Sequence, residues 1–182
     1  MIEQFAEQAQ PILNIPVIRR TRRNHGLEHA TITILSSRIK PLSMAGRSDG
    51  DGFFLFGEVA TEQVQLAVAE ALRRMKRGER SLAVHPNCGT NLVTTSFLAS
   101  IAAMLGMAGA RRSGFLNRLP LVMSFVSIAI LLSQPLGLSL QRHITTDGDP
   151  ADLEVIEITR KEVRMPLSEG TMTVHRVTTY SS

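Results

Sequence analysis

The chain has one cysteine, no tryptophan and few aromatic side chains. Aromatic residues make up 4% of its 182 residues, against 43% hydrophobic residues, so Leu, Ile, Val, Ala and Met carry most of the apolar content. The single cysteine, Cys88, excludes a disulfide within the chain and fits a reducing compartment or a metal or redox role. The formal charge is +4, but almost no aromatic side chains stand among the basic ones to stack on bases, so we expect no nucleic-acid partner.

Charged residues are absent from two long segments, residues 92–110 and 119–140. Each segment is close to the roughly 20 residues that a helix needs to cross a bilayer. The alternative is a pair of buried core helices, but a chain of this length has too little other material to enclose two wholly apolar helices. The sequence therefore predicts a transmembrane helical hairpin whose partner is the lipid bilayer.

The N-terminal stretch MIEQFAEQAQPILNI is acidic and polar and does not resemble an export signal. Basic residues are more numerous in the flank before the first apolar segment, Arg73 to Arg80, than in the short loop that carries Arg111, Arg112 and Arg118. We therefore expect a multi-pass protein of the inner (cytoplasmic) membrane with both termini in the cytoplasm. Paired spans also suggest contact with another membrane protein or a second copy of the chain.

The remaining sequence predicts an α+β fold in three portions: a soluble portion at residues 1–91, the helical hairpin at 92–140, and a soluble β tail at 141–182. A helix that starts near Val17 is expected to end between Ala30 and Leu35, where ATITIL is rich in β-branched residues. Asp49-Gly50-Asp51-Gly52 predicts a β-hairpin turn, and Thr61 is expected to cap an amphipathic helix that Gly78 ends. The tail predicts two strands around Pro166 to Gly170, with His175 on the surface.

The pentapeptide His25-Gly26-Leu27-Glu28-His29 places two histidines four residues apart. In a helix this spacing puts both imidazoles on one face, where they can bind the same ion, with Glu28 beside that face. The spacing is that of the inverted zincin motif, H-x-x-E-H, in which two histidines bind zinc and the glutamate polarises a bound water. The alternative is an ordinary polar start of a helix on a basic surface.

A second motif, His85-Pro86-Asn87-Cys88-Gly89-Thr90-Asn91, brings an imidazole and the single thiol onto one turn before the first apolar segment. Tetrahedral zinc accepts this mixture of nitrogen and sulfur ligands. The alternative is a plain helix start in which Asn87 or Thr90 caps the helix and Cys88 is a small buried residue.

The two motifs together, HGLEH and HPNCGTN, resemble those of a known protein family. HGLEHATI, followed by a Gly-rich hairpin, a helix, and HPNCGTNL running into an apolar helix, resembles a family of small bacterial membrane proteins of unknown function. In the form HGxEH and HPxCGT, the pair is also similar to the YqhQ-type membrane proteins, which are described as metal-dependent enzymes. The resemblance covers residues 17–140 and implies a membrane location and a site for zinc or another divalent transition metal. It implies His25, His29, His85 and Cys88 as ligands, with Glu28 as the water-activating base.

Two functions follow from such a site. If one position on the metal stays open to water, the protein is a metal-dependent hydrolase; if both His85 and Cys88 bind, the site is closed and structural, and serves assembly or partner binding. Inverted zincins complete their site with a distant glutamate. The best candidate here, Glu70, adjoins a basic stretch and can instead pair with Arg73 or Arg74.

Overall fold

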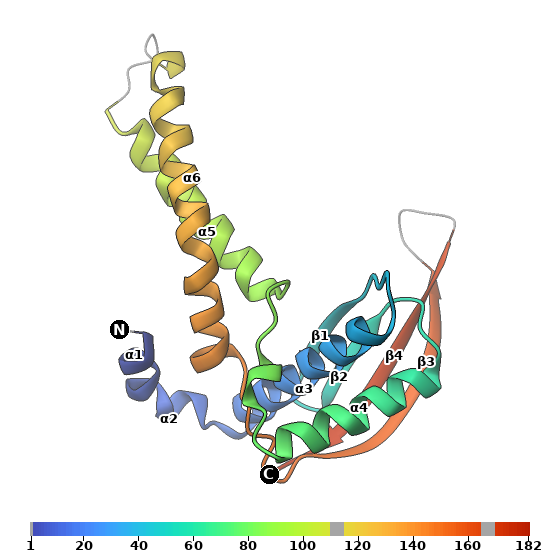
Figure 1. Ribbon diagram of the computed structural model, residues 1–182. Helices are drawn as coiled ribbons and strands as arrows, with labels where there is room; N and C mark the ends of the chain where they lie inside the picture. The colour runs from blue at the N-terminus through green and yellow to red at the C-terminus, as the bar shows by residue number, and fades with distance from the viewer. Residues whose placement is uncertain (1, 110–114, 165–169) are drawn as a thin grey trace. The chain divides into compact units, whose positions relative to one another are not determined.

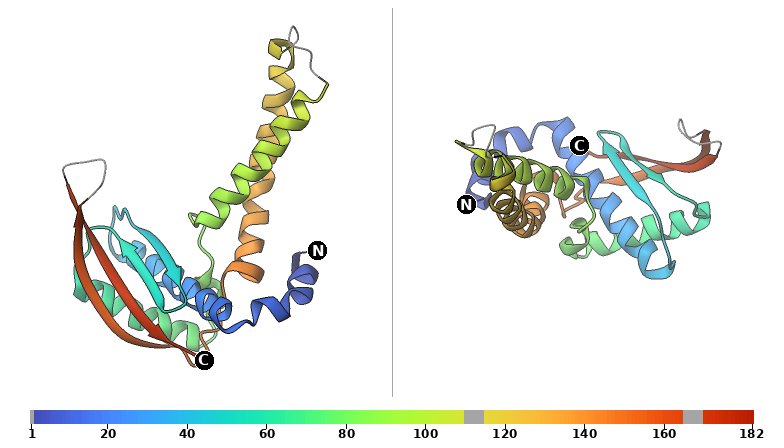
Figure 2. Two further views of the ribbon diagram at one scale, coloured as in Figure 1. Left: turned by 180° about the vertical axis from the view of Figure 1, so that it is seen from behind. Right: turned by 90° about the horizontal axis from the view of Figure 1, so that it is seen from above.

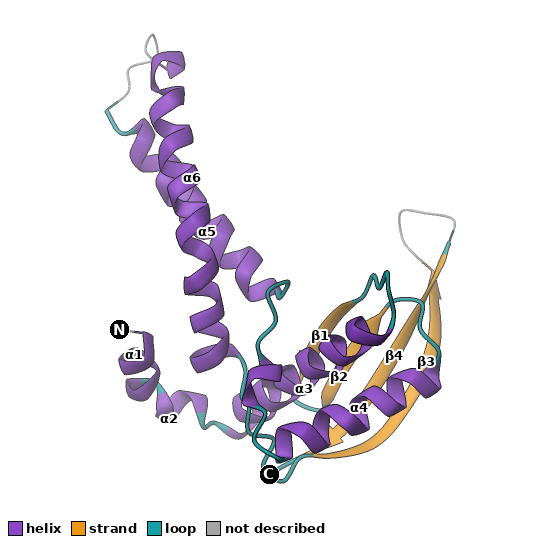
Figure 3. Cartoon of the chain, viewed as in Figure 1, coloured by secondary structure: helices purple, strands orange, loops and turns teal. Residues whose placement is uncertain are grey.

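The computed structural model describes residues 2–109, 115–164 and 170–182. The chain forms two compact units, residues 1–85 with 142–182, and residues 86–141. The predicted α+β class is confirmed: an N-terminal helix and β-hairpin, two long apolar helices and a C-terminal β-hairpin follow one another along the chain (Figure 3).

Within its described residues, the first unit contains four α-helices, a short 3-10 helix and most of a π-helix. They are α1 (Ile2–Gln8), α2 (Gln10–Leu13), α3 (Pro16–Arg38), α4 (Thr61–Lys76), the 3-10 helix η1 (Arg80–Ala83) and the π-helix η3 (Gln141–Thr145). The prediction that Thr61 caps its helix is wrong, because Thr61 is the first residue of α4 and Ala60 is its N-cap.

The helix that was predicted to start near Val17 and to end between Ala30 and Leu35 is α3. Its predicted end is wrong, because α3 continues to Arg38. Ile34 and Leu35 are buried in the core, and the Thr31 hydroxyl bonds back to the Leu27 carbonyl at 2.8 Å. Packing and this bond offset the low helix propensity of the β-branched residues.

The sheet of this unit joins strands from both ends of the chain. Its strands are β1 (Ala45–Asp49), β2 (Gly52–Phe56), β3 (Glu154–Arg164) and β4 (Thr171–Tyr180), in the antiparallel order β1-β2-β4-β3. The hairpin at residues 49–52 is confirmed. The predicted tail turn lies largely outside the described residues, at 165–169. The pairing of β2 with β4 ties the tail to the N-terminal hairpin, which the sequence did not predict.

Helices α3 and α4 cover the same face of this sheet (Figures 1 and 2). Leu27 of α3, Val64 of α4, Phe53 of β2 and Val177 of β4 are fully buried between these layers. The prediction that His175 lies on the surface is wrong: its side chain is fully buried on β4, and Nε2 lies 3.1 Å from the Thr61 hydroxyl of α4. The polar alternation of β4 therefore does not mark a solvent-exposed face.

The second unit is a pair of helices, α5 (Gly89–Met107) and α6 (Phe115–Leu140), which pack along each other (Figure 3). Close approach is allowed by Gly106, where a Cβ atom would lie 2.9 Å from Val122. The Gln141 side chain also donates to Asn91 at 2.9 Å. Both helices are long and apolar enough to cross a membrane, and many of their large side chains are exposed, such as Met104 and Leu131. Arg111 and Arg112, used above for orientation, lie outside the described residues.

An ion pair ties the last part of the chain to α3 and makes the first unit sensitive to acid. Asp152 accepts the backbone N–H of Ser182 at 2.8 Å and pairs with buried Arg23 at 2.8 Å. The hydrogen bonds from Ser182 and the charge of Arg23 lower the pKa of Asp152 from 3.8 to about 2. Because the lowered pKa belongs to the folded state, this stabilisation is complete above pH 3.8 and disappears as the pH falls towards 2.

We expect Asp152→Asn to unfold at a lower temperature than the wild type at pH 7, because the neutral amide gives up the charged contact. The difference should shrink as the pH falls below 3.8, where wild-type Asp152 also becomes neutral. The difference in unfolding temperature is measured at several pH values by thermal unfolding monitored with circular dichroism. Glu157→Gln, an exposed carboxylate on β3, is the control. A pH-independent difference would contradict the assignment.

Candidate metal centre

Two histidines on α3 form the centre of the candidate site. His25 and His29 lie one helical turn apart, with ring centroids 4.4 Å from each other, and His29 is only 3% exposed. The Nδ1 atom of His29 donates to the Ala83 carbonyl at 2.8 Å, and Nδ1 of His25 donates to the Thr145 carbonyl at 3.0 Å. A carbonyl can only accept, so each ring carries its proton on Nδ1 and its lone pair on Nε2. Metal-binding histidines are commonly fixed in this way.

The segment that holds His25 is itself held against α3. The Arg22 guanidinium donates to the carbonyls of Ile144 at 2.7 Å, Thr146 at 3.2 Å and His143 at 3.3 Å. The backbone N–H of Asp147 donates to the Arg22 carbonyl at 2.9 Å. Burial lowers the pKa of Arg22, and the nearby Asp147 charge acts in the opposite direction. The position of the Thr145 carbonyl, and with it the His25 ring, therefore depends on Arg22.

Gly26 allows this close approach of the two segments. A Cβ atom at Gly26 would lie 2.3 Å from the carbonyl oxygen of Asp147, which is a backbone atom and cannot swing aside. The glycine inside the HGLEH motif is therefore a packing requirement of the site and not a helix-ending signal.

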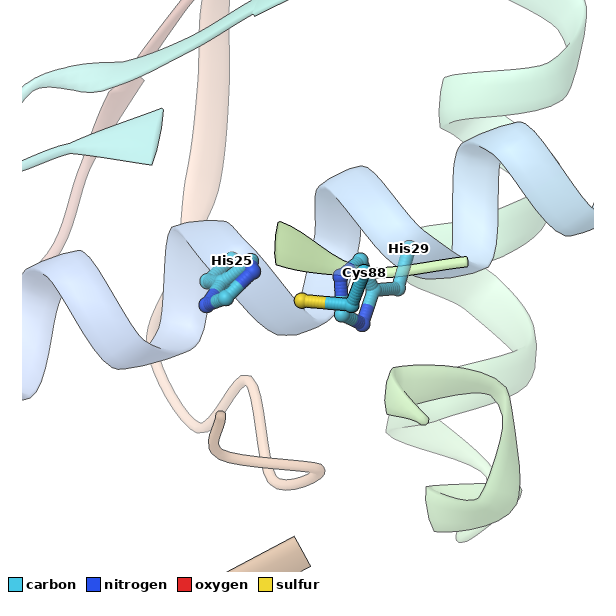
Figure 4. Close-up of side chains that lie close together, drawn as sticks. All are labelled: His25, His29 and Cys88. Atoms are coloured by element: carbon cyan, nitrogen blue, oxygen red, sulfur yellow. The ribbon is translucent and has the colours of Figure 1, made fainter. Parts of the chain in front are cut away.

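Cys88 supplies sulfur to the cluster. It is the N-cap of α5, and its sulfur accepts the backbone N–H of Thr90 at 3.4 Å. The candidate ligand atoms of His25, His29 and Cys88 all lie within 4.8 Å of one another (Figure 4). Only Pro86 and Asn87 separate Cys88 from His85, so its Cα atom stays within about 11 Å of that of His85. These three residues could hold a metal ion.

His85 lies beside the three residues whose ligand atoms are grouped among the described residues. Its ring centroid is 5.9 Å from that of His29. Burial lowers the pKa of His85, which favours the neutral imidazole that a metal ligand requires. The role of His85 as a ligand stays a prediction.

Glu28 faces strand β1. It is 4% exposed, accepts a hydrogen bond from the Ser48 hydroxyl, and packs on the backbone of Gly46, where a Cβ would lie 2.1 Å from its carboxylate. Burial raises the pKa of Glu28, while the bond from Ser48 and the charge of His25 act in the opposite direction. The structure thus places the carboxylate in a low-dielectric pocket close enough to His25 for their charges to interact. Its predicted part in catalysis stays a prediction.

Glu70 pairs with Arg38 of α3 and, at 3.6 Å, with Arg74 on its own helix. It is not among the clustered ligand atoms. Sequence reasoning missed the residues that position the histidines: the carbonyls of Ala83 and Thr145, and the Arg22 side chain. Residue types do not show which backbone carbonyl will lie next to a histidine, because every residue has one. The glycine within the helical HGLEH motif could have indicated that another backbone segment lies close to it.

We expect Gly26→Ala to weaken both the fold and the metal site, because the added methyl group forces Asp147 and the neighbouring Thr145 carbonyl away from α3. The free energy of unfolding should fall by about 1–3 kcal/mol, as for other overpacked sites. Zinc affinity, measured by competition with a chromogenic chelator, should fall as well. Gly50→Ala is the matched control, since its new Cβ would meet only the side chains of Val17 at 3.6 Å and Thr21 at 3.9 Å, which are ordinary contacts. Equal affinity in both variants would contradict the role given to Gly26.

The chain resembles proteins whose function has not been assigned. A relative from Picosynechococcus sp., an uncharacterized protein, is 34% identical over 151 residues, which covers 75% of this chain and 70% of the relative. No solved structure matches the chain. The model of the domain of unknown function DUF6391 matches residues 20–158, a range that contains both histidine motifs, α4 to α6 and the start of β3. The chain therefore belongs to the DUF6391 family.

Proposed function

We propose that this protein is a membrane-anchored, metal-dependent hydrolase. His25, His29 and Cys88 bind zinc or a similar divalent ion, and Glu28 serves as the base that takes a proton from water. The observation that carries the proposal is that, among the described residues, the ligand atoms of His25, His29 and Cys88 lie within 4.8 Å of one another. Catalytic zinc sites bind three protein ligands and keep the fourth position for water, whereas structural sites use four.

The surroundings of the three ligands support the same function. Both imidazoles are oriented through Nδ1 by backbone carbonyls, so Nε2 is prepared for the ion before it binds. Glu28 lies on the same helix as the two histidines, and burial raises its pKa, which makes its carboxylate a stronger base for a proton taken from water. Zinc would supply a bound water of lowered pKa and a positive charge that stabilises the developing anion. The resemblance of HGxEH and HPxCGT to the YqhQ-type proteins points in the same direction.

A membrane anchor is the second part of the proposal. It rests on two helices whose length and composition allow a span and whose large apolar side chains are largely exposed. Cys88 directly precedes α5, so the third ligand lies at the beginning of the first of these helices. We propose that hydrolysis takes place at the cytoplasmic face of the inner membrane.

His85 favours a second candidate, a structural metal site. If a small rotation brings its ring onto the ion, the ligand set becomes His₃Cys and the position for water is lost. The metal would then tie α3 to the start of α5 and serve assembly or contact with a partner protein.

Metal analysis of the purified protein tests the ligands. We expect one zinc or other divalent transition ion per chain in the wild type, and its loss in His29→Ala and in Cys88→Ser, because both side chains belong to the cluster. His175→Ala, which removes another fully buried histidine, is the control and should keep the ion. A wild type without bound metal after zinc loading would refute both candidate functions.

Cobalt substitution separates the catalytic site from the structural one. With an open position, azide should bind the cobalt and change its visible spectrum, and His85→Ala should leave this response unchanged. A spectrum insensitive to azide in the wild type but sensitive in His85→Ala would instead favour the closed His₃Cys site.

Glu28→Gln tests the base. We expect this variant to retain the metal. Its rate of metal-dependent hydrolysis of p-nitrophenyl acetate should fall by about 10²- to 10⁴-fold, which is the usual contribution of general base catalysis. Glu70→Gln, whose carboxylate pairs with arginines away from the cluster, should keep the wild-type rate. Equal rates for Glu28→Gln and wild type would remove Glu28 from the mechanism.

A further inference from the structure

A groove runs between helix α4 and the edge strand β3, on elements that do not contribute to the metal centre. Its volume is about 710 Å³, within the range of small-molecule sites. Val68 and Leu72 of α4 and Val155 and Ile158 of β3 contribute apolar side chains to its walls. Both elements lie in the first unit, and Figure 1 shows them side by side.

Positive charge gathers along one stretch of this groove. Arg73, Lys76 and Arg77, from the last turns of α4, line it, and Glu154 is the one carboxylate among the lining residues. None of the three cations forms an ion pair within the described residues, whereas Arg74 on the same helix pairs with Glu70 and Glu79. The groove thus combines an apolar wall with unneutralised positive charge.

We propose that this groove binds a long-chain fatty acid. The acyl chain lies along Val68, Leu72 and Ile158, and the carboxylate meets the cations at the end of α4. The negative headgroup complements the three cations, and their long stems add apolar surface beside the chain. This proposal does not depend on the metal centre.

Photo-crosslinking of the full-length protein in phosphatidylcholine nanodiscs tests the site. The probe is palmitate with a diazirine near the middle of its chain, and adducts are located by mass spectrometry of peptides. We expect adducts on peptides from α4 and β3, and competition by unlabelled palmitate. The fatty alcohol of equal length should label these peptides about tenfold less, because it lacks the charge that the cations bind.

Two pairs of variants test the apolar wall of the groove and its cluster of cations separately. Ala69→Trp places a ring into the groove from an exposed lining position, and should reduce labelling about tenfold. Leu66→Trp, on the same helix and 64% exposed but outside the lining, should not. Lys76→Gln/Arg77→Gln should make palmitate label no better than the alcohol. Arg47→Gln/Lys161→Gln, which removes two exposed charges from β1 and β3, should retain the preference.

Circular dichroism and thermal unfolding confirm that each variant is folded before labelling. Adducts confined to α5 and α6 would show that the probe reaches the protein only from the bilayer, and would overturn the proposal. Equal labelling of Ala69→Trp and Leu66→Trp would do the same. In a separate sample without palmitate, a bifunctional amine crosslinker that joins Lys76 of α4 in one copy to Lys161 of β3 in another would show that a second chain, and not a fatty acid, occupies the groove.

Discussion

Two backbone carbonyls determine the geometry of the candidate metal centre. The carbonyls of Ala83 and Thr145 accept the Nδ1 protons of His29 and His25, and so fix which nitrogen of each ring can bind an ion. Both carbonyls come from segments that follow α3 in the chain, 54 residues beyond His29 and 120 residues beyond His25. The site therefore exists only when η1 and the segment after α6 are both packed against α3.

The fold brings these segments together through its sheet and a single arginine. Pairing of β2 with β4 joins the two ends of the chain in one unit, so residues 142–182 return to α3 after the two apolar helices. Arg22 then binds three carbonyls between His143 and Thr146. Glu28, on the same helix, is buried against Gly46 and Ser48 of β1. One helix, α3, thus carries both imidazoles and the proposed base, and presents them to different neighbours.

The local patterns predicted most of the elements but few of their tertiary contacts. Spacing of four residues in HGLEH predicted that both imidazoles share a face, and DGDG predicted the β1–β2 turn, because both depend on neighbouring residues only. The end of α3 was misplaced because burial of the β-branched residues Thr31 and Ile34 outweighs their lower helix propensity, which a local pattern cannot register. His175 was assigned to the surface because an alternating strand does not reveal that β4 is central and covered by α4. Grouping Cys88 with the α3 histidines agrees with the structure, whereas the carbonyls that orient them could not be inferred from residue types.

We propose that two imidazoles and one thiolate bind a metal ion that retains a position for water. X-ray absorption at the zinc edge of the zinc-loaded protein tests this ligand set. We expect one sulfur at about 2.3 Å and three lighter atoms at about 2.0–2.1 Å, two of which show the outer-shell scattering of imidazole. Three imidazoles with one sulfur would give the closed structural site. A shell of oxygen atoms without sulfur would contradict the proposed ligands.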